Sequence, residues 1–545
     1  VHQKSYTSSD VSFDLGIACY LPGSGSLVSA SPEISYSISD NTYLEARYNS
    51  DGSCMIPSYI ESDMTLSVEC SPYYATGDIT IPAGVILDID AGVEIRLPQD
   101  ANIYISGELN ANGTGSEDIL FTTAPGSTQW GGMVFRNTST PSTLVYVTIE
   151  NASEGPVPII ENAAISAMNA DLVLDHLVIT QTFGNPIMAR YSDVVLTNSE
   201  LHSEVTGDLI NVKYGTARIE NCKFTGNNMP DTDAIDYDEV IGGVIRNVSI
   251  NGFYGFNSDA VDIGEEAEDV TIDSIVVYNI TDKGISLGQL STATVSNSIF
   301  INCNLGVAVK DSSTAIINNS VFYNNVYPVA CYEKNVGLAG GNASVRNSIL
   351  SNYAESIYLQ DERSTIRFSH TLADGNDSIP GNENLLGDPL FREPSYFDFE
   401  LNSSSPAILS GIDSNGNPVN IGTQLSIADF EPTIMITEFF VNAPDGLLPE
   451  YIKVYNPTDK TVNASGYYID KGITATIPEG TIINPGRHLY LTSDASDYLW
   501  DGVIVPVIQW EDGHLSNNGE AIRLLDDHGI VLDHFRYDID QERDS

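Results

Sequence analysis

The chain has 545 residues, of which 42% are hydrophobic and only 18% are charged. It therefore has enough apolar material to fold, and it is too long for one ordinary core. Its 74 Asp and Glu residues outnumber its 23 Lys and Arg residues, and the formal net charge of −51 excludes nucleic acid and anionic lipid as partners. The chain has 44 glycines and no long helix-forming stretch, which favours β-structure with many turns. No apolar stretch of about 18 residues occurs, so we expect no membrane span.

Residues 1–77 are interpreted as a β-rich N-terminal region or a cap. Alternating stretches such as SFDLGIACYL and EISYSI predict short strands there. Three of the six cysteines, Cys19, Cys54 and Cys70, fall in this region, and we expect one disulfide among them. The other three lie in strand-like repeats and are predicted to be buried thiols, because the sequence has no CxxC pair for a structural zinc site.

The middle of the chain repeats one pattern. Nine six-residue segments, of which AISAMN is the first and SIYLQD the last, recur every 22 to 28 residues. Their third position is mostly polar or small and their second is aliphatic, as in a strand whose side chains alternate between core and surface. The aliphatic residues are Ile165, Ile187, Ile210, Ile235, Val261, Ile285, Val307, Val329 and Ile357. A unit of this length cannot close a core alone, so we predict stacked turns around one interior.

A second column of the repeat consists of asparagines. They stand at matching places in six of the repeats, at Asn198, Asn221, Asn247, Asn297, Asn319 and Asn347. Asparagine tolerates left-handed backbone and can hydrogen-bond to its own turn and to the rung beside it. The column therefore predicts an asparagine ladder along one corner.

Several longer strings identify the type of coil. They are TIPAGVILDIDAGVEIRL (80–97), the early rungs that contain WGGMVF and STLVYVTIENA, and GDPLF (387–391) with DFELNSSSPAILSGID (398–413) as closing rungs. With the repeat, they make residues 78–430 resemble the right-handed parallel β-helix of pectate lyases and their relatives. The resemblance implies the fold but no single activity, because this fold hosts lyases, hydrolases, epimerases, adhesins and stalks.

The last part of the chain has a different pattern. From Ile434 onward, MITEFFVNAPDG, EYIKVYNPT, GYYIDKG and LSNNGEAIRLL form short alternating strands with turn signals between them, as in a β-sandwich. Residues 434–540 resemble the lamin-tail domain, an immunoglobulin-like module, and the resemblance implies attachment or spacing without catalysis. The predicted fold class is therefore all-β, a right-handed parallel β-helix followed by an immunoglobulin-like β-sandwich.

Two adjacent rungs carry the same acidic pattern, in NMPDTDAIDYDE and NSDAVDIGEE. The alignment stacks six acids as three pairs, which are Asp233 with Asp259, Asp236 with Asp262, and Glu239 with Glu265. Rungs are spaced about 4.8 Å apart, and two carboxylates at that distance repel by roughly 3 kcal/mol at an effective dielectric constant near 20. Such pairs require a cation, raised pKa values or basic neighbours.

Basic residues stand in the neighbouring positions of this stack, Lys283 and Lys310 on later rungs and Arg190 and Lys213 on earlier ones. In a first interpretation, the six acids bind Ca²⁺, which takes about six to eight hard oxygen ligands. In a second, the resemblance to β-helix lyases implies that acid-bound calcium neutralises a uronate while Lys283 or Lys310 removes the C5 proton. In a third, the charges are solvated or paired on an acidic surface, each pair contributing less than about 1 kcal/mol.

We interpret the protein as an extracellular or cell-surface module for structure, adhesion or assembly, with a rigid β-helix that binds Ca²⁺ and polysaccharide. The alternative is a calcium-dependent polysaccharide lyase or a related carbohydrate-active enzyme. The expected partners are polysaccharide, other cell-surface components and, through self-assembly, further copies of the chain. Tyr191 and Tyr214 are expected to stack on sugar rings, with Arg190 and Lys213 beside them.

Overall fold

The computed structural model describes two segments of the coil and a set of shorter stretches. They are residues 54–157, 159–374, 379–394, 398–423, 425, 434–441, 449–458, 460–495, 507–517, 519–527 and 531–537, together with four N-terminal strands. Those strands are β1 (Val11–Leu15), paired with β4 (Ile34–Ile38), and β2 (Ala18–Tyr20), paired with β3 (Leu27–Ala30), both antiparallel. They agree with the short strands that the alternating stretches predict.

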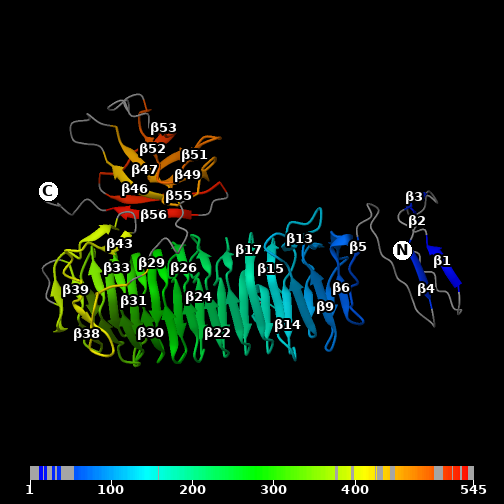
Figure 1. Cartoon of the computed structure of the whole chain (residues 1–545), viewed down its shortest axis with the longest axis horizontal. Helices are drawn as coiled ribbons and strands as arrows, with labels where there is room; N and C mark the ends of the chain where they lie inside the picture. The colour runs from blue at the N-terminus through cyan, green and yellow to red at the C-terminus, as the bar shows by residue number, and fades with distance from the viewer. Residues whose placement is uncertain are drawn as a thin grey trace.

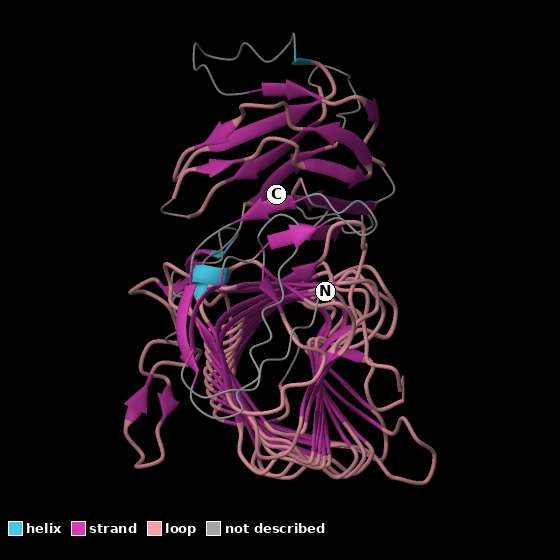
Figure 2. Cartoon of the chain, turned by 90° about the vertical axis from the view of Figure 1, so that its right-hand side faces the viewer, coloured by secondary structure: helices cyan, strands magenta, loops and turns pink. Residues whose placement is uncertain are grey.

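A single parallel coil makes up most of the molecule (Figure 1). Its sheet contains 37 strands, from β5 to β41, and each strand pairs with the strand one rung later. Viewed along the coil, the strands form the sides and loops form the corners (Figure 2). The register groups the strands into three faces, which we call the first, second and third face.

The first face contains β8 (Ile79–Ile81), β11 (Ile103–Ile105), β14 (Met133–Arg136), β16 (Ala163–Met168), β18 (Asn185–Arg190), β21 (Ile210–Lys213), β24 (Ile235–Asp238), β27 (Val261–Gly264), the later halves of β29 (Val276–Leu287) and β31 (Ile299–Lys310), β34 (Tyr327–Tyr332) and β37 (Tyr358–Gln360).

The second face contains β6 (Met64–Leu66), β9 (Ile86–Asp90), β12 (Glu108–Asn112), the earlier halves of β15 (Ser142–Glu150) and β17 (Leu172–Thr180), β19 (Val194–Thr197), β22 (Ala217–Glu220), β25 (Val244–Arg246), β28 (Val270–Asp273), β30 (Thr292–Ser296), β32 (Thr314–Asn318), β35 (Asn342–Arg346), β38 (Thr365–Ser369) and β40 (Gly381–Asn382).

The third face contains β5 (Cys54–Met55), β7 (Tyr73–Tyr74), β10 (Glu94–Leu97), β13 (Ile119–Thr123), the later halves of β15 and β17, β20 (Glu200–His202), β23 (Lys223–Thr225), β26 (Ser249–Phe253), the earlier halves of β29 and β31, β33 (Val321–Tyr323), β36 (Ile349–Ser351), β39 (Leu372–Ala373) and β41 (Leu385–Leu386).

The aliphatic column of the repeat lies inside the coil, as predicted. Eight of its nine residues, from Ile165 to Val329, pair in register along the first face, and all of them are fully buried. At the ninth rung the register shifts by one residue, because Val329 pairs with Tyr358 rather than with Ile357. Ile357 is nevertheless buried, so the interior continues through that rung.

The asparagine column occupies a left-handed corner, as predicted. All six asparagines have φ between 50° and 55°. Nδ2 of Asn221 donates to Asn198 Oδ1 at 3.1 Å, and Nδ2 of Asn247 donates to Asn221 Oδ1 at 2.7 Å. The ladder is then interrupted, because Ser274 takes the corner position of the next rung with φ of 59°. The amide chain therefore links Asn198, Asn221 and Asn247, whereas Asn347 bonds to the backbone of Ile412.

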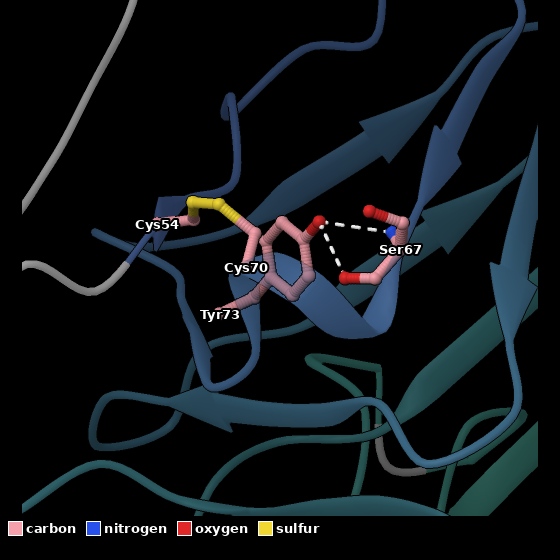
Figure 3. Close-up of a disulfide and its surroundings, with 4 residues drawn as sticks. All are labelled: Cys54, Ser67, Cys70 and Tyr73. Carbon is pink, nitrogen blue, oxygen red and sulfur yellow. Dashed lines mark hydrogen bonds between the residues drawn. A yellow bond between two sulfur atoms is a disulfide. The ribbon is translucent and has the colours of Figure 1, made fainter. Parts of the chain in front are cut away.

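The coil begins at Cys54, and not at residue 78 where we placed its start. β5 pairs with β7, and β7 pairs with β10, so residues 54–77 belong to the first rungs and not to a separate N-terminal region. Cys54 and Cys70 form the expected disulfide beside Tyr73, whose hydroxyl group bonds to the backbone of Ser67 (Figure 3). The two-residue strands β5 and β7 are too short to show an alternating pattern in the sequence.

The strings GDPLF and DFELNSSSPAILSGID do not form closing rungs, contrary to our prediction. They fold into antiparallel pairs, β42 (Phe391–Glu393) with β43 (Asp398–Leu401) and β44 (Gly411–Ile412) with β45 (Pro418–Val419). Phe391, Phe399, Ala407 and Ile421 pack against outward-facing residues of the third face, which are Val276, Ile299, Ile301, Val321, Ile349 and Leu372. These outward residues are apolar, so they need the cover that the hairpins provide.

The C-terminal part is a β-sandwich. One sheet contains β46 (Met435–Phe440), β47 (Tyr451–Tyr455), β52 (His488–Thr492) and β53 (Val507–Gln509), and the other contains β49 (Tyr468–Lys471), β50 (Ile473–Thr476), β54 (Asp512–Gly513), β55 (Glu520–Leu525) and β56 (Val531–Tyr537). A small pair, β48 (Val462–Asn463) with β51 (Ile482–Ile483), completes it. Alternate residues such as Ile452 and Ile469 fill its separate core.

The sandwich lies against the third face of the coil (Figures 1 and 2). Asn279 Nδ2 donates to Asp533 Oδ1 at 3.2 Å, and Asn251 Nδ2 donates to Leu532 O at 3.5 Å. All four residues are buried, so β56 is fixed to β26 and β29 by polar groups that water does not reach. The expected linker, residues 426–433, lies outside the described residues.

We predict that charge is excluded from the aliphatic column. Ile285→Asp would place an unpaired carboxylate in the coil interior, and it should lower the free energy of unfolding by several kcal/mol, about 3–5 kcal/mol. Ile316→Asp is the matched control, because Ile316 is 47% exposed on β32, and it should melt within a few degrees of the parent. Thermal unfolding followed by circular dichroism measures both. Equal melting temperatures for the two variants would mean that the coil does not bury this column.

Candidate functional site

The outward positions of the first face bring the predicted acids together. The central column contains Asn211, Asp236, Asp262 and Ser286, paired rung by rung. Asp236 and Asp262 therefore stack as the alignment predicted. Because these residues alternate with buried aliphatic residues on β21, β24 and β27, the repeat itself directs their side chains outward.

A loop column runs beside the central column, at the loop where each strand of the first face begins. Its members are Asp208, Asp233, Asp259 and Lys283. The Asp259 amide donates to Asp233 Oδ1 at 2.6 Å, and the Lys283 amide donates to Asp259 Oδ1 at 2.9 Å. The Asp233 amide donates in the same way to Asp208 Oδ1 at 3.2 Å. Each carboxylate therefore caps the backbone of the next rung.

Asp208 is a site residue that our sequence analysis missed. It stands two residues before Ile210, just as Asp233 stands two residues before Ile235 and Asp259 two before Val261. A third acid at that alignment position was therefore visible in the sequence. Its rung lacks the further acids that accompany Asp233 and Asp259.

Lys283 is fully engaged with carboxylates. Its Nζ lies 3.2 and 3.3 Å from the two oxygens of Asp259 and 2.5 Å from Asp282 Oδ2. Burial alone would lower the pKa of Lys283, but the charges of Asp259 and Asp282 raise it above its usual value. Burial also raises the pKa of Asp259 to about 6, against the opposing effect of Lys283. Lys283 thus stays protonated, as a structural counter-ion.

Asn211 joins two half-buried carboxyl groups. Its Nδ2 donates to Asp208 Oδ2 at 3.3 Å and also to Asp236 Oδ2. Burial raises the pKa of Asp208 to about 6. Burial, together with repulsion from Asp208, Asp238 and Asp262, holds the pKa of Asp236 well above its usual value. These carboxyl groups therefore retain protons at a pH where exposed aspartates have lost them.

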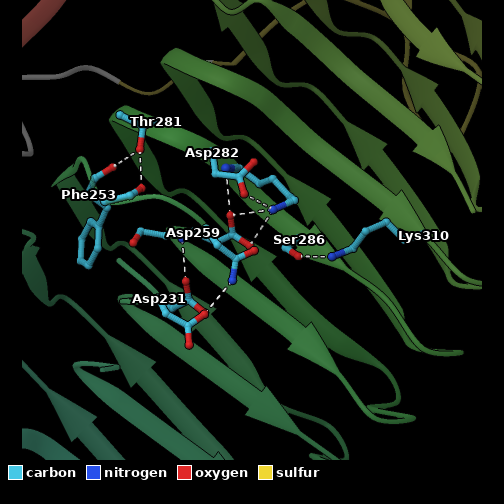
Figure 4. Close-up of polar contacts among 12 residues, drawn as sticks. Asp231, Phe253, Asp259, Thr281, Asp282, Ser286 and Lys310 are labelled. Carbon is cyan, nitrogen blue, oxygen red and sulfur yellow. Dashed lines mark hydrogen bonds and ion pairs between the residues drawn. The ribbon is translucent and has the colours of Figure 1, made fainter. Parts of the chain in front are cut away.

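Lys310 differs from Lys283 in its partners. Its Nζ donates to Ser286 Oγ at 2.6 Å, and no described carboxylate lies within ion-pair distance of it (Figure 4). Only 4% of Lys310 is exposed, and burial lowers its pKa although the charge of Asp262 opposes this. The side-chain carboxylate of Asp262 accepts no hydrogen bond from a described residue. The side chains of Lys310 and Asp262 thus have no ion-pair partner among the described residues, so both can still bind a ligand.

A corner column follows the central column at the other end of the strands. Tyr191, Tyr214, Glu239 and Glu265 all occupy its left-handed position, with φ between 50° and 61°. The rings of Tyr191 and Tyr214 stack with centroids 4.6 Å apart and an angle of 12° between their planes. Tyr191 is 54% exposed, and stacking of these rings on a sugar stays a prediction.

The two early basic residues behave differently from each other. Lys213 pairs with Glu265 and lies 3.5 Å from Asp238 Oδ2. Burial alone would lower its pKa, but these carboxylates hold the pKa of Lys213 above its usual value. Arg190 precedes Lys213 in register and forms no ion pair with a described residue, and its buried Nε has no hydrogen-bond partner. Only Arg190 of the two has a cationic group that no carboxylate neutralises.

The six predicted metal ligands do not converge on one point. Among the described residues, no group of three or more His, Cys, Asp and Glu side chains is arranged to hold a metal ion. The reason is that Asp233 and Asp259 accept backbone N–H groups, Asp236 accepts from Asn211, and Glu265 pairs with Lys213. This arrangement does not fit a shared calcium ion, and calcium binding stays a prediction.

Two family models match the chain. The right handed beta helix region matches residues 131–338 and 239–383, and the Lamin Tail Domain matches residues 430–538. The chain is a right-handed β-helix protein with a C-terminal lamin tail domain. No curated protein matches it. Within the described residues, no helix is long and apolar enough to cross a membrane.

Several solved structures are similar to the β-helix at low identity. The periplasmic alginate epimerase AlgG is 12% identical, with a TM-score of 0.38, over 57% of this chain and 77% of that one. Pectate lyase Pel9A is 12% identical, with a TM-score of 0.30, over 61% and 88%. The A-module of the Azotobacter vinelandii mannuronan C-5 epimerase AlgE4 is 12% identical, with a TM-score of 0.25, over 60% and 89%.

A calcium titration tests the shared-cation hypothesis. If Asp233, Asp236, Asp259 and Asp262 shared a cation, calcium at a hundredfold excess over its dissociation constant would stabilise the fold by about 2.7 kcal/mol. Asp236→Asn combined with Asp262→Asn would then abolish the response. Because these carboxylates already accept hydrogen bonds, we expect the melting temperature of the chelator-treated protein to stay unchanged in millimolar calcium. An unchanged melting temperature would contradict the hypothesis and favour the hydrogen-bonded carboxyl groups described above.

The buried carboxyl groups predict an unusual pH dependence of stability. The pKa of Asp208 and of Asp259 is raised to about 6 in the folded protein, whereas unfolded aspartate titrates near pH 3.9. Between these values the folded state holds protons that the unfolded state releases. The free energy of unfolding therefore falls as pH rises toward about 6 and stays low above it, by about 3 kcal/mol per group.

Urea unfolding at pH 5 and pH 8 measures this effect, and we expect the protein to be more stable at pH 5. Asp208→Asn should reduce the difference, because an amide does not titrate. Asp90→Asn, at an exposed position of β9, should leave the difference unchanged. Higher stability at pH 8 than at pH 5 would contradict the prediction.

Proposed function

We propose that the first face carries the catalytic site of a polysaccharide lyase, or of a related enzyme that removes a proton from a sugar carbon. The proposed substrate is a polysaccharide that contains uronate, and the proposed general base is Lys310. One observation carries this proposal. Lys310 is a buried lysine whose Nζ bonds to a neutral hydroxyl, Ser286 Oγ at 2.6 Å, beside the uncommitted carboxylate of Asp262.

The two lysines suggested by the sequence are not equivalent as bases. A general base must be deprotonated near the working pH, so a lysine needs a lowered pKa to serve. Burial lowers the pKa of Lys310, whereas the carboxylates of Asp259 and Asp282 raise that of Lys283. We therefore assign the base to Lys310 and a charge-balancing role to Lys283. A lysine with a lowered pKa beside carboxyl groups with raised pKa values is a pattern found at catalytic sites.

The proposed reaction uses groups of this chain alone. The neutral Nζ of Lys310 takes the proton from the carbon next to the uronate carboxylate. The C4–O4 bond then breaks, a C4=C5 double bond forms, and the ammonium returns its proton to the departing O4. Because burial raises the pKa values of Asp233 and Asp236, their protonated carboxyl groups can donate hydrogen bonds to the sugar carboxylate instead of repelling it. A protein of net charge −51 needs such neutral contacts to bind a polyanion.

We predict that Lys310→Met abolishes turnover while the fold remains. A general base contributes about 10²–10⁴-fold in rate, so activity should fall by that factor. The assay follows the ultraviolet absorbance of the unsaturated product and the proton exchange at C5 by NMR, on polygalacturonate and alginate. Lys471→Met, on the sandwich strand β49, is the matched control and should keep full activity.

Absence of product from the wild-type protein on every polyuronate tested would overturn the enzymatic proposal. A second candidate would then stand, a non-catalytic extracellular or cell-surface module that binds polysaccharide. The Tyr191–Tyr214 stack favours this candidate, because an exposed aromatic residue such as Tyr191 suits sugar binding without chemistry. Binding of polymer without turnover would support it. Location outside the cell belongs to both proposals, and self-assembly belongs to the second.

A further inference from the structure

Phe256 is an exposed aromatic residue beside the first face. Its exposed fraction is 87%, although it lies in the loop only three residues before Asp259. A single exposed apolar side chain is ordinary in soluble proteins and needs no special cause by itself. The loop that holds this one, however, is bonded to the rungs on both sides.

Hydrogen bonds fix the Phe256 loop to the rungs on both sides. On the preceding rung, the Asp231 amide donates to Phe256 O at 2.9 Å. On the following rung, Thr281 Oγ1 donates to Gly255 O at 2.8 Å and to Phe253 O at 3.2 Å (Figure 4). Position 255 also has no room for a side chain, because a Cβ atom there would overlap Met229 O. The backbone of this loop is therefore fixed in place, and the Phe256 ring that it carries is exposed.

The ring stands at the border of the acid–base groups. The chain continues from Phe256 to Ser258, whose Oγ accepts the Thr232 amide at 3.1 Å, and then to Asp259 in the loop column. Met229, in the loop of the preceding rung, is 39% exposed. An apolar edge thus lies before the first-face strands β24 and β27, next to the Asp259 carboxyl group, while the Tyr191–Tyr214 stack lies after the earlier first-face strands β18 and β21.

We infer that Phe256 is a substrate-binding residue whose ring stacks on a sugar unit of a polysaccharide lying across the first face. This inference rests on the proposed function. Sugar rings present an apolar C–H face with hydroxyl groups at the rim, so they match an aromatic face bordered by hydrogen-bonding groups. A protein partner would require an apolar patch of several hundred Å². One ring with a half-exposed methionine suits a sugar unit instead.

The test compares Phe256→Ala and Phe256→Trp with the full-length wild-type chain. Isothermal titration measures the affinity for oligomers of galacturonate and of mannuronate. Loss of one stacked ring should weaken binding roughly five- to tenfold, and Phe256→Trp should keep the affinity and add a fluorescence change on binding. Val336→Ala, at a 97% exposed position in another loop, is the matched control and should bind as the parent does. Both Phe256 variants should melt with the parent because the ring is exposed.

The outcomes separate this inference from the proposed function. If the wild-type protein turns over a polyuronate and Phe256→Ala binds it with unchanged affinity, the stacking role is wrong and the catalytic assignment stands. If the wild-type protein binds no oligomer, both are wrong. If Phe256→Ala loses affinity while Lys310→Met keeps it and loses turnover, both are supported.

Discussion

The hydrogen bonds between parallel rungs set each residue of the coil opposite one residue of the next rung, and the rest of the structure depends on this constraint. A side-chain type that repeats in the sequence becomes a continuous column in space. Aliphatic residues such as Ile210 and Ile235 form an unbroken interior, and asparagines such as Asn198 and Asn221 form an amide chain at a corner. The same rule stacks acids on acids, where repetition is unfavourable. In the columns that contain Asp233 and Asp236, carboxyl groups of successive rungs therefore repel one another.

That repulsion is relieved in several physical ways at once. The carboxylates of the loop column accept backbone N–H groups of the next rung, which satisfies their oxygens without a cation. Lys283 supplies a compensating charge at the end of that column. The carboxyl groups of Asp208 and Asp236, for which no such cation is at hand, keep protons instead. In the resulting polar cluster, Lys283 pairs with carboxylates, whereas Lys310 bonds only to a hydroxyl group. This difference between the two lysines is the basis for proposing Lys310 as the general base.

One outer surface of the coil is covered by other parts of the chain, and another carries polar groups. The third face carries apolar outward residues, and the hairpins of 391–419 together with strand β56 of the sandwich lie against it. Asp533 of the sandwich is buried there against Asn279. The first face has polar outward residues. The lamin tail domain is thus attached to the side of the coil that does not hold the acid–base groups.

The sequence by itself determined the repeat, the buried aliphatic column, the direction of Asp236 and Asp262, and the change of fold near residue 434. These properties are local or periodic, so a pattern of polar and apolar residues is enough to specify them. Only the tertiary structure decided that Lys283 is neutralised while Lys310 is not, because this depends on side-chain positions contributed by different rungs and on burial by their neighbours. It also decided that the coil starts at Cys54, since two-residue strands are too short to show a pattern in the sequence. It decided, too, that residues 391–419 form hairpins against the third face, since alternating residues do not indicate the surface against which a hairpin packs.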